Sequence, residues 1–487
     1  MTYKHGVYGE LTESQVAAAV QSGTVAAYVG TAPVHLLKDY SGLVNTPIEL
    51  TGYSQAMQTI GYSDDWTNYT LCEAVAEHFN NSVQSAGPIY VVNVLDPDAL
   101  KSSEQTSVTI TTVNGKYSFK SDNIILNTFA ISSKTEGKDF EVSYSFAKGE
   151  VTVTALSGEL SAATASYYTV DPNKVTAADV IGETTESGEL KGLDALKLLY
   201  QKYNVVLNLL GAPKFSEDPS VYKAMCSHVQ HLNGHWDAMV VADIPLSDSD
   251  GAIDTRAKAI AWKEKHGYTS EFSKVCWPKY KDGAGKVHSI SSAVIATQLA
   301  VDEGNDNVPY ESASNNECEA VELYYGEDAK NAGLMGDEEA NELNAKGITT
   351  VCFLGSVYKI WGPHTAAYTY GGSFDARDTF DTYIRTLMYI INDFQLRFAG
   401  RIDQAMSPND KDSILKEEQD FLDGLKAMGA LVGSSTVSFE STDNPTSSLI
   451  DGNFVFTIGV TTAPLAKSIS TKAYYTDSGL SEYFVQA

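Results

Sequence analysis

Between Gly188 and Leu354, short apolar runs alternate with segments whose apolar residues recur at helical spacing. The apolar runs are Val205–Leu210, Ala238–Asp243, Lys274–Pro278 and Thr349–Leu354. The helical segments run through Leu193–Tyr203, Val221–Leu232, Ile253–His266 and Ser289–Val301. Strands that are apolar throughout are typical of a parallel sheet buried on both faces, and the crossover helices supply the cover. The pattern therefore predicts an α/β fold for this part of the chain.

The same rhythm occurs earlier in the chain and is then interrupted. Strands are predicted over Thr24–Gly30 and Ile89–Leu95, with a helix over Thr70–Asn80 between them. From about residue 101 to residue 188 the chain is instead rich in Ser, Thr, Val and Gly. Its short alternating runs are Ser107–Thr112, Tyr117–Lys120, Glu141–Phe146 and Val151–Ala155, with turn sequences between them. This texture predicts a self-contained β-sandwich domain inserted between two α/β segments.

The C-terminal part combines long helices with extended runs. Apolar spacing predicts one helix over Asp375–Phe398, with Ser373 as its N-cap, and a second over about Asp410–Met428. Asn453–Val460 and Ser468–Tyr475 read as extended. In the first of these runs, the residues that share one face are Phe454, Phe456, Ile458 and Val460.

The first residues of the chain also alternate like a strand, with Tyr3, His5 and Val7 on one side. A lone or two-stranded ribbon is marginal in water, so both ends of the chain need a strand partner. That partner is either the chain's own sheet or the sheet of a neighbouring copy. Addition of strands to a neighbour's sheet is a heterologous contact, which propagates into a ring or a helical filament.

The net charge of the chain limits the classes of partner that it can bind. The 487 residues contain 62 Asp and Glu against 34 Lys and Arg, a net charge of -28. Such a surface repels nucleic-acid phosphates and anionic lipid headgroups, so we expect neither nucleic acid nor membrane as a partner. The first residues lack the basic start and apolar run of a secretory signal, and we expect synthesis in the cytoplasm. Five scattered cysteines without a CxxC pair argue against a disulfide framework.

The sequence offers little catalytic or metal-binding chemistry. His228, His231 and His235 have helical spacing, but Asn233-Gly234 predicts that the helix ends before the third imidazole. Gly283–Lys286 lacks the earlier Gly and the following Ser or Thr of a phosphate-binding loop. No G-x-S-x-G elbow is present, although spacing alone never excludes a Ser/His/Asp triad. We expect no catalytic residue, no metal and no cofactor.

Two features indicate contact surface instead. Residues 302–342 carry 13 Asp or Glu and one Lys, which fits a solvated face or an electrostatic partner for a basic patch on another chain. Tyr outnumbers Phe by 28 to 17, and Tyr combines large contact area with a polar tip. A Tyr excess is also typical of proteins rich in β structure.

Four segments of the N-terminal part form recognisable motifs: HGVY at His5–Tyr8, SGTVAAYVGTAP at Ser22–Pro33, GYSDDWTNYTLCEAV at Gly61–Val75 and YVVNVLDP at Tyr90–Pro97. These segments resemble contractile tail sheath proteins. The run Gly452–Leu480 is similar to the sheath C-terminus found in phages and phage-tail-like bacteriocins of Gram-positive bacteria. The resemblance covers nearly the whole chain and is weakest over about residues 98–187.

The resemblance implies a structural subunit that polymerises helically around a tail tube, is anchored to a baseplate, and contracts to drive the tube through a cell envelope. It also implies a subtilisin-like doubly wound α/β core, an inserted β-sandwich, an α+β C-terminal domain and extended terminal arms. The domains would be an N-terminal arm (1–20), the first part of the core (21–97), the inserted domain (98–187), the main core (188–357) and the C-terminal domain with its arm (358–487). Fold alone does not imply function, and the serine segment of true subtilases is absent.

In this family the arms reach into adjacent subunits and complete a shared sheet. The resemblance gives this role to Tyr3, His5, Val7, Tyr8, Phe454, Phe456, Ile458, Val460, Ile469 and Tyr474. The partners it implies are copies of the same chain, the tail tube protein, and baseplate and tail terminator proteins. The chain would sit in a virion tail or a phage-tail-like particle.

Alternatives stay open at this point. Lys411, Lys416 and Lys426 could face an acidic tube, or their helix could simply pack on Phe394 and its neighbours. The chain could also form a non-contractile filament or shell, or be a serine hydrolase on a subtilisin-like scaffold.

Overall fold

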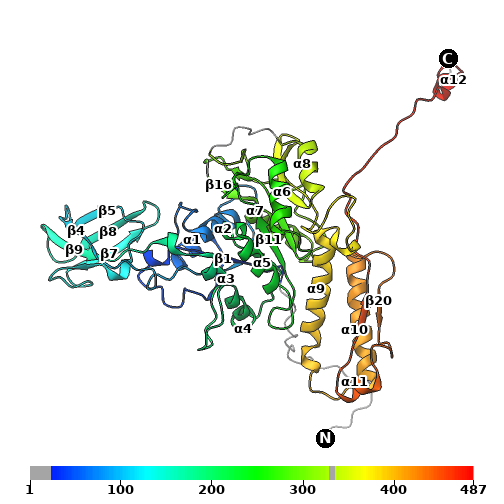
Figure 1. Cartoon of the computed structure of the whole chain (residues 1–487), viewed down its shortest axis with the longest axis horizontal. Coiled ribbons are helices and arrows are strands. Elements are labelled where there is room, and N and C mark those ends of the chain that lie inside the picture. Colours follow the sequence, from blue (N-terminus) through cyan, green and yellow to red (C-terminus); the bar gives the residue numbers. More distant parts are fainter. Residues whose placement is uncertain (1–22, 328–334, 486–487) are drawn as a thin grey trace, which may run out of the picture.

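The computed structural model describes residues 23–327 and 335–485, and Figure 1 shows their arrangement. A central α/β body carries a small β domain at one end and a pair of long helices at the other. The C-terminal segment leaves the body in an extended conformation and points into solvent. The predicted residues Tyr3, His5, Val7 and Tyr8 lie outside the described residues.

Eight strands form the main sheet, and its six inner strands are parallel. In spatial order they are β19 (Val357–Trp361), β18 (Ile348–Leu354), β14 (Ser273–Cys276), β11 (Met239–Asp243), β10 (Leu209–Gly211), β1 (Ala26–Gly30), β3 (Ile89–Asn93) and β2 (Pro47–Leu50). The two outermost strands run antiparallel to their neighbours. The chain adds β3 on one side of β1 and then adds β10, β11, β14 and β18 in turn on the other side. The predicted parallel sheet is confirmed.

Strand β10 is shorter and later than predicted. The sequence favoured Val205–Leu210, but the ladder covers Leu209–Gly211. Asn208 sets this boundary, because its side-chain Oδ1 accepts the Val25 N–H at 2.8 Å and its own N–H donates to Val25 O at 2.9 Å. A side-chain bond thus replaces one rung of the sheet just before the strand begins.

Helices cover the sheet and connect its strands (Figure 1). They are α1 (Tyr53–Thr59), α2 (Thr70–Phe79), α3 (Ala177–Ile181), α4 (Leu198–Tyr203), α5 (Pro219–His228), α6 (Arg256–His266), α7 (Ile290–Gly304) and α8 (Asp337–Asn344). Helix α5 ends at His228 instead of Leu232, because His231 (φ 56°) is left-handed and the helix cannot continue through it. Short 3-10 helices lie at Val34–Leu36, Leu126–Thr128, Pro172–Lys174, Gly192–Lys197, Phe215–Glu217, Ala376–Asp378 and Ala399–Arg401.

Two three-stranded sheets form the β domain. One contains β4 (Thr106–Ile110), β9 (Ala163–Tyr167) and β6 (Ala130–Ile131), and the other contains β5 (Lys116–Phe119), β8 (Glu150–Ala155) and β7 (Phe140–Ser145). Buried residues from both sheets form one shared cluster, in which the rings of Phe119, Phe129 and Tyr167 stack. The domain therefore has its own apolar core, and the predicted short strands are confirmed.

Two small antiparallel sheets lie outside the main sheet of the body. They are β12 (Ser247–Asp248) with β13 (Gly251–Ala252), and the three-stranded sheet of β15 (Lys279–Lys281), β16 (Val287–Ser289) and β17 (Glu322–Tyr324). The β15–β16 hairpin docks on the body near α2 through contacts described below.

The C-terminal part is built on two long helices, α9 (Asp381–Phe398) and α10 (Pro408–Met428). Helix α10 covers the predicted Asp410–Met428 and begins two residues earlier, with a reciprocal cap between Ser407 and Asp410 and a Pro at its first position. A two-stranded sheet, β20 (Thr436–Ser438) and β21 (Thr457–Gly459), flanks the helices together with α11 (Thr446–Ile450). The last element is α12 (Ser478–Val485) at the end of the extended segment.

The predicted start of α9 is wrong. Ser373 does not cap it; a 3-10 turn capped by Asp375 comes first, and α9 begins at Asp381. The Asp381 side chain is fully buried in an ion pair with Lys274 of β14. This long-range contact, rather than a local cap, fixes where the helix starts.

Candidate assembly arm and the pocket at its root

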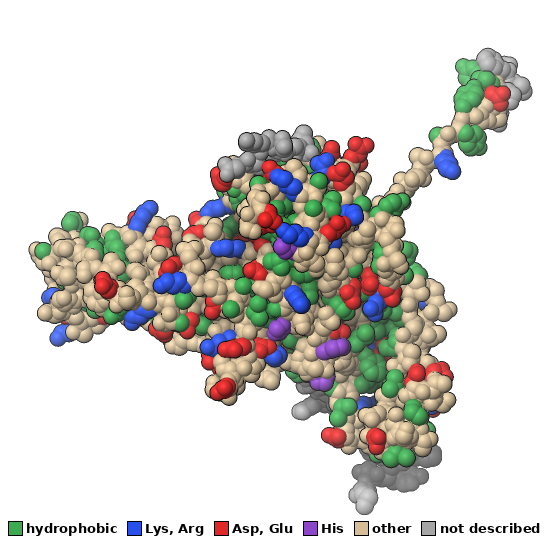
Figure 2. Space-filling view, in the orientation of Figure 1, with side chains coloured by type: hydrophobic (Ala, Val, Ile, Leu, Met, Phe, Trp, Pro, Cys, Tyr) green, Lys and Arg blue, Asp and Glu red, His purple; other side chains and the backbone are tan. Residues whose placement is uncertain are grey.

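The C-terminal segment after β21 projects from the body with apolar side chains in solvent. We call residues 469–485 the arm. Between Ala463 and Asp477 the structure describes no strand or helix. Ile469, Tyr474 and Tyr475 are 89%, 87% and 84% exposed. Figure 2 shows hydrophobic side chains grouped at the far end of the arm. Exposed aromatic residues on extended chain are typical of a segment that a partner covers.

The root of the arm is held to the body. Val432 N–H donates to Thr461 O at 2.9 Å, and Ala463 N–H donates to Ala430 O at 3.0 Å. Lys467 Nζ then lies 3.5 Å from the Tyr368 hydroxyl and 5.9 Å from the centre of the Tyr370 ring. Beyond Lys467 these contacts stop, so the root fixes the direction in which the arm leaves.

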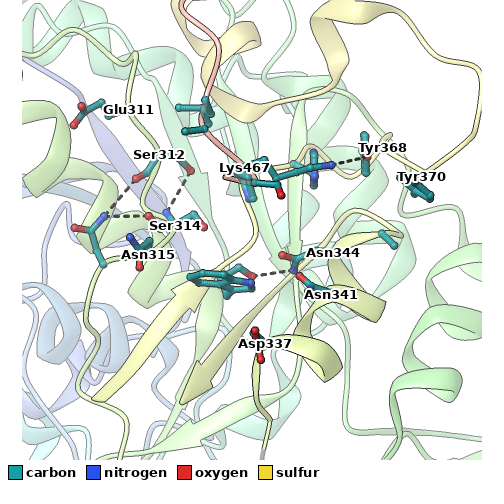
Figure 3. Close-up of a pocket in the computed structure, with 18 residues that line it drawn as sticks. Glu311, Ser312, Ser314, Asn315, Asp337, Asn341, Asn344, Tyr368, Tyr370 and Lys467 are labelled. Carbon is teal, nitrogen blue, oxygen red and sulfur yellow. Dashed lines mark hydrogen bonds between the residues drawn. The ribbon is translucent and has the colours of Figure 1, made fainter. Parts of the chain in front are cut away.

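A pocket of about 730 Å³ opens beside the root (Figure 3). Its lining is polar and aromatic in character. The lining residues come from the 311–316 loop, α8, the end of β19, the 363–370 loop and the arm root at 465–468. The 311–316 loop, α8, the stretch from Trp361 to Tyr370 and the arm root are separate in sequence, so only the folded chain creates the pocket.

Several polar side chains of the pocket wall form hydrogen bonds to the backbone of the same chain. Asn344 Nδ2 donates to Ile348 O and to Trp361 O, both at 3.0 Å. Ser314 Oγ accepts the Gly362 N–H at 3.0 Å. These bonds hold the wall in place. Asp337 and Asn341 differ, because neither side chain hydrogen-bonds to another described residue.

The aromatic wall of the pocket is uncharged at neutral pH. His364 stacks on Tyr368 with 3.6 Å between ring centres, and its Nδ1 lies 2.7 Å from Thr379 O. Burial lowers the pKa of His364 to about 4. The neutral ring therefore serves as a flat packing surface.

A buried ion pair supports the pocket from below. Lys274 Nζ is bonded to Asp381 and donates to Gly362 O at 2.9 Å. Ser312 Oγ donates to the same Asp381 carboxylate at 3.0 Å. Strand β14, helix α9 and the 311–316 loop are thereby joined beneath the pocket floor.

The other sequence-predicted arm residues divide into two groups. Phe456, Ile458 and Val460 pack on the chain's own C-terminal part: Ile458 is paired with Val437 of β20, and the Phe456 ring lies 6.1 Å from that of Phe394. Phe454 is 37% exposed. Ile469 and Tyr474 lie on the exposed arm. The structure therefore does not bring the predicted set together within one chain.

Sequence reasoning missed Lys467, Tyr368, Tyr370 and the pocket. Only the Tyr excess pointed toward a surface of this kind, and it named no position. Of the lysines predicted to face a tube, Lys411 and Lys416 are ion-paired with Asp412 and Asp420 of the same helix, and Lys426 is exposed. Their role stays a prediction.

A second polar cluster lies at the carboxyl edge of the main sheet, the edge at which α/β folds usually bind ligands. His288 of β16 is ion-paired through Nδ1 with Glu77 at 2.7 Å and through Nε2 with Asp282 at 3.3 Å. Tyr280 donates its hydroxyl to the same Glu77 at 2.8 Å. Burial lowers the pKa of His288, but Glu77 and Glu73 outweigh burial and raise it to about 9. A charged His288 thus locks the hairpin onto α2.

Asp243, at the end of β11, completes the cluster. Ser291 of α7 donates to its carboxylate from both N–H and Oγ. Burial raises the pKa of Asp243 to about 7. Nearby, Lys279 is ion-paired with Glu217 at 2.7 Å. Both nitrogens of His288 face carboxylates, so His288 is not placed as a base for a serine.

The histidines at spacing i, i+3, i+7 do not converge. His228 Nε2 lies 3.4 Å from Asp194, while His231 Nδ1 lies 3.5 Å from Asp237. Within residues 23–327 and 335–485, no three His, Cys, Asp or Glu side chains form a group that could hold a metal ion. Among the same residues, no helix is both long and apolar enough to cross a bilayer.

These features define a class: an α/β body whose polar cluster is ion-paired within the chain, a separate β domain, and a projecting arm with exposed apolar side chains. Comparisons narrow the class. The chain is 27% identical over 489 residues to the tail sheath protein of Burkholderia phage BcepMu, covering 95% of this chain and 94% of that one. It is 25% identical over 308 residues to a putative prophage major tail sheath protein of Pseudomonas aeruginosa strain UCBPP-PA14, covering 63% of this chain and 74% of that one.

The fold agrees with the sequence likeness. The sheath complex of the extracellular contractile injection system PVC, in its contracted state, superposes with a TM-score of 0.55 at 14% identity, covering 98% of this chain and 100% of that one. A chain in the baseplate structure of the anti-feeding prophage matches with the same TM-score, identity and coverage. No protein-family model matches the chain.

The resemblance to contractile tail sheath proteins is thereby confirmed, and with it the expectation of a structural protein and not an enzyme. The mixed α/β architecture with several sheets is similar to that of the PVC sheath chain. The two relatives that are similar in sequence are tail sheath proteins of a phage and, putatively named, of a prophage. The narrower expectation, a sheath of the Gram-positive type, stays a prediction.

Proposed function

We propose that the chain is the structural subunit of a contractile tail sheath, which polymerises helically around a tail tube and contracts to drive the tube through a cell envelope. The observation that carries this proposal is the projecting arm, whose Ile469, Tyr474 and Tyr475 are more than four-fifths exposed in the single chain. The likeness to a phage tail sheath protein over 95% of the chain supports it.

The arms supply the contacts between copies. Among the described residues, sheet β20–β21 has two strands, which is marginal in water, and added strands would stabilise it. We assign that addition to the N-terminal residues Tyr3, His5, Val7 and Tyr8 of one neighbour and to the arm, with Ile469 and Tyr474, of another. Phe454, Phe456, Ile458 and Val460 would then form the receiving side and its apolar backing.

We explain contraction by a difference between two parts of the arm, the strand that joins a neighbour's sheet and the extended segment next to it. Main-chain hydrogen bonds of an added strand resist sliding because many rungs must break together, whereas the extended segment between Lys467 and α12 can bend. Copies can therefore rearrange without separating. The free energy that drives contraction is the difference between two sets of contacts between copies, those of the extended and those of the contracted array.

The finer architecture is part of the same proposal. We assign residues 21–97 and 188–357 to a doubly wound, subtilisin-like core, residues 98–187 to an inserted β-sandwich, and residues 358–487 to an α+β C-terminal domain with its arm, preceded by an N-terminal arm at 1–20. The reversal of strand order at β1 and the separate core of the β domain support this division.

The partners would be further copies of the chain, a tail tube protein, and baseplate and tail terminator proteins. Lys411, Lys416 and Lys426 on α10 are candidates for tube contact. Neither nucleic acid nor membrane is a partner in this proposal. The particle would be a virion tail or a phage-tail-like particle assembled in the bacterial cytoplasm.

Negative-stain electron microscopy of the purified chain tests the proposal. We expect helical tubes, and shorter, wider tubes after contraction. Tubes of a single fixed length and width under all conditions would favour a non-contractile filament or shell. A monodisperse monomer that reacts with a serine-directed fluorophosphonate would overturn the proposal in favour of a hydrolase.

A further inference from the structure

The pocket beside the arm root has the dimensions of a small-molecule site. Its volume of about 730 Å³ falls within the roughly 300–1,000 Å³ that is typical of ligand pockets. Figure 3 shows labelled side chains of the 311–316 loop on one side of it, and those of α8, Lys467 and Tyr368 on the other. Side chains from several segments therefore surround one space, and all of them belong to a single chain.

Several polar groups of the lining form no hydrogen bond with another described residue. They are the Asp337 carboxylate, the Asn341 carboxamide, the Ser468 and Tyr370 hydroxyls and the Trp361 indole N–H. The set contains an acceptor, a donor and groups that both donate and accept. It is suited to a ligand with many hydroxyl groups, because each hydroxyl both donates and accepts hydrogen bonds.

Aromatic rings lie beside these polar groups. Trp361, Tyr368 and Tyr370 line the pocket, and the Tyr368 ring is held flat by its stack on His364. The ring of a sugar has the complementary form, since its C–H groups make an apolar face and its hydroxyls lie around the edge. Packing of that face on an aromatic ring removes apolar surface from water and leaves the hydroxyls free to bond.

The charges of the lining disfavour ionic ligands. Glu311 and Asp337 supply two carboxylates against the one ammonium group of Lys467, so the pocket repels anions. Lys467 Nζ lies 5.7 Å and 5.9 Å from the centres of the Tyr368 and Tyr370 rings. The chain's own cation therefore takes the position over these rings that an organic cation needs. A lipid tail would leave the polar groups of the wall without partners, which is unfavourable.

We propose that the pocket binds a neutral oligosaccharide, with a sugar ring against Tyr370 and hydroxyl groups bonded to Asp337 and Asn341. Asp337 and Asn341 lie one turn apart on α8, so both face the same ligand. The Tyr370 N–H donates to Ala345 O at 2.7 Å, which holds Tyr370 next to the end of α8. The inference goes beyond the proposed function and does not rest on it, because one chain supplies the whole site.

Titration of the full-length chain with chitotetraose and with maltotetraose tests the site. The two probes distinguish an N-acetylated glycan of the cell-wall type from a glucan. High-speed centrifugation first removes assembled tubes, and isothermal titration calorimetry then measures binding. We expect saturable heat with at least one probe. Absence of heat with both probes at millimolar concentration would overturn the inference.

Tryptophan fluorescence locates the bound saccharide. The chain has five Trp residues, of which Trp361 lines the pocket. Saccharide binding should change the emission of the unmodified chain. Trp361→Phe keeps an aromatic face and should remove most of this change. An unaltered change of emission in Trp361→Phe would place the saccharide elsewhere on the molecule and overturn the pocket assignment.

Substitutions at the pocket rim test the named contacts. Asp337→Ala and Tyr370→Ala should each weaken saccharide binding about tenfold. Glu338→Ala is the matched control, since Glu338 is exposed on the same helix but does not line the pocket. Asp337 and Tyr370 are exposed, so the melting curves of the variants should match that of the unmodified chain. Equal affinity of the two rim variants and the control would overturn the proposed contacts.

Competition with ions tests the argument from charge. Neither spermidine nor inorganic phosphate should displace the bound tetrasaccharide at millimolar concentration. Displacement by spermidine would show that the carboxylates recruit an organic cation, and displacement by phosphate would show that Lys467 recruits an anion. Either result would overturn the assignment of a neutral ligand.

Discussion

Arg385 of α9 and Asp302 of α7 form a fully buried ion pair that ties the C-terminal helices to the α/β body. Both guanidinium Nη atoms face the carboxylate. Asp302 also accepts from Thr24 Oγ1 at 2.6 Å and from Gln298 Nε2 at 2.8 Å. Three segments distant in sequence therefore meet at one carboxylate, where the described N-terminal end of the chain enters β1.

Arg385→Met should lower the free energy of unfolding by about 3–5 kcal/mol, because it leaves Asp302 buried without its counter-charge. Chemical denaturation monitored by circular dichroism measures this. Adding Asp302→Asn should recover most of the loss, since the amide can still accept from Thr24 and carries no charge. A double variant no more stable than Arg385→Met would show that packing of the Arg385 stem, and not the unpaired charge, sets the cost.

Asp243→Asn should stabilise the chain above neutral pH and leave it unchanged near pH 4. Burial raises the pKa of Asp243 to about 7, so the folded state holds its proton more tightly than the unfolded state does. The stability from this group is present in full below about pH 4 and is lost as pH rises toward 7. Asparagine copies the neutral form, because its Oδ1 can accept the Ser291 N–H and its Nδ2 can donate to Ser291 Oγ in place of the bond that Oγ now donates.

Thermal melts of the two proteins from pH 4 to pH 8 test this prediction. The difference should grow through that window to about 2–4 kcal/mol. Lys279 and Glu217 also face Asp243, so the profile reports the cluster around it. Parallel profiles for the variant and the unmodified chain would contradict the assignment.

The order of strands and helices was predictable, because the local spacing of apolar residues determines where each element forms. β1 and β11 are buried along their whole length, so their apolar runs were visible in the sequence. The start of α9 was not, since Asp381 pairs with Lys274, which lies 107 residues earlier. The pocket was hidden for the same reason: Asp337, Trp361 and Lys467 come from separate segments, and only folding brings them together.

Lys263→Met should raise stability at pH 7 by about 1–3 kcal/mol. Lys263 is buried on α6 with one hydrogen bond, from Nζ to Ala366 O at 2.7 Å, and burial lowers its pKa to about 8. Holding the charge in the folded state is unfavourable. The unmodified chain should therefore gain stability as pH rises from 8 to 10, while the variant does not.

Lys258→Met is the control for this comparison. Lys258 is exposed on the same helix and paired with Asp254 at 2.6 Å. Its removal should change stability by less than about 1 kcal/mol. Equal effects of the two substitutions would mean that helix propensity, and not burial of the ammonium group, explains the gain.

Deleting residues 1–15 should leave a soluble, folded subunit that does not form tubes. The alternation of Tyr3, His5 and Val7 fits a strand that needs a sheet, and the proposed sheet belongs to a neighbouring copy. Val7→Pro should have a similar effect with a single change, because proline cannot donate a hydrogen bond to a ladder. Val7→Thr keeps both the donor and a strand-forming side chain, so it should assemble normally. Electron microscopy scores the tubes, and a melting curve confirms that each variant is folded. If Val7→Pro and Val7→Thr assemble equally well, the N-terminal segment does not join its neighbour as a strand.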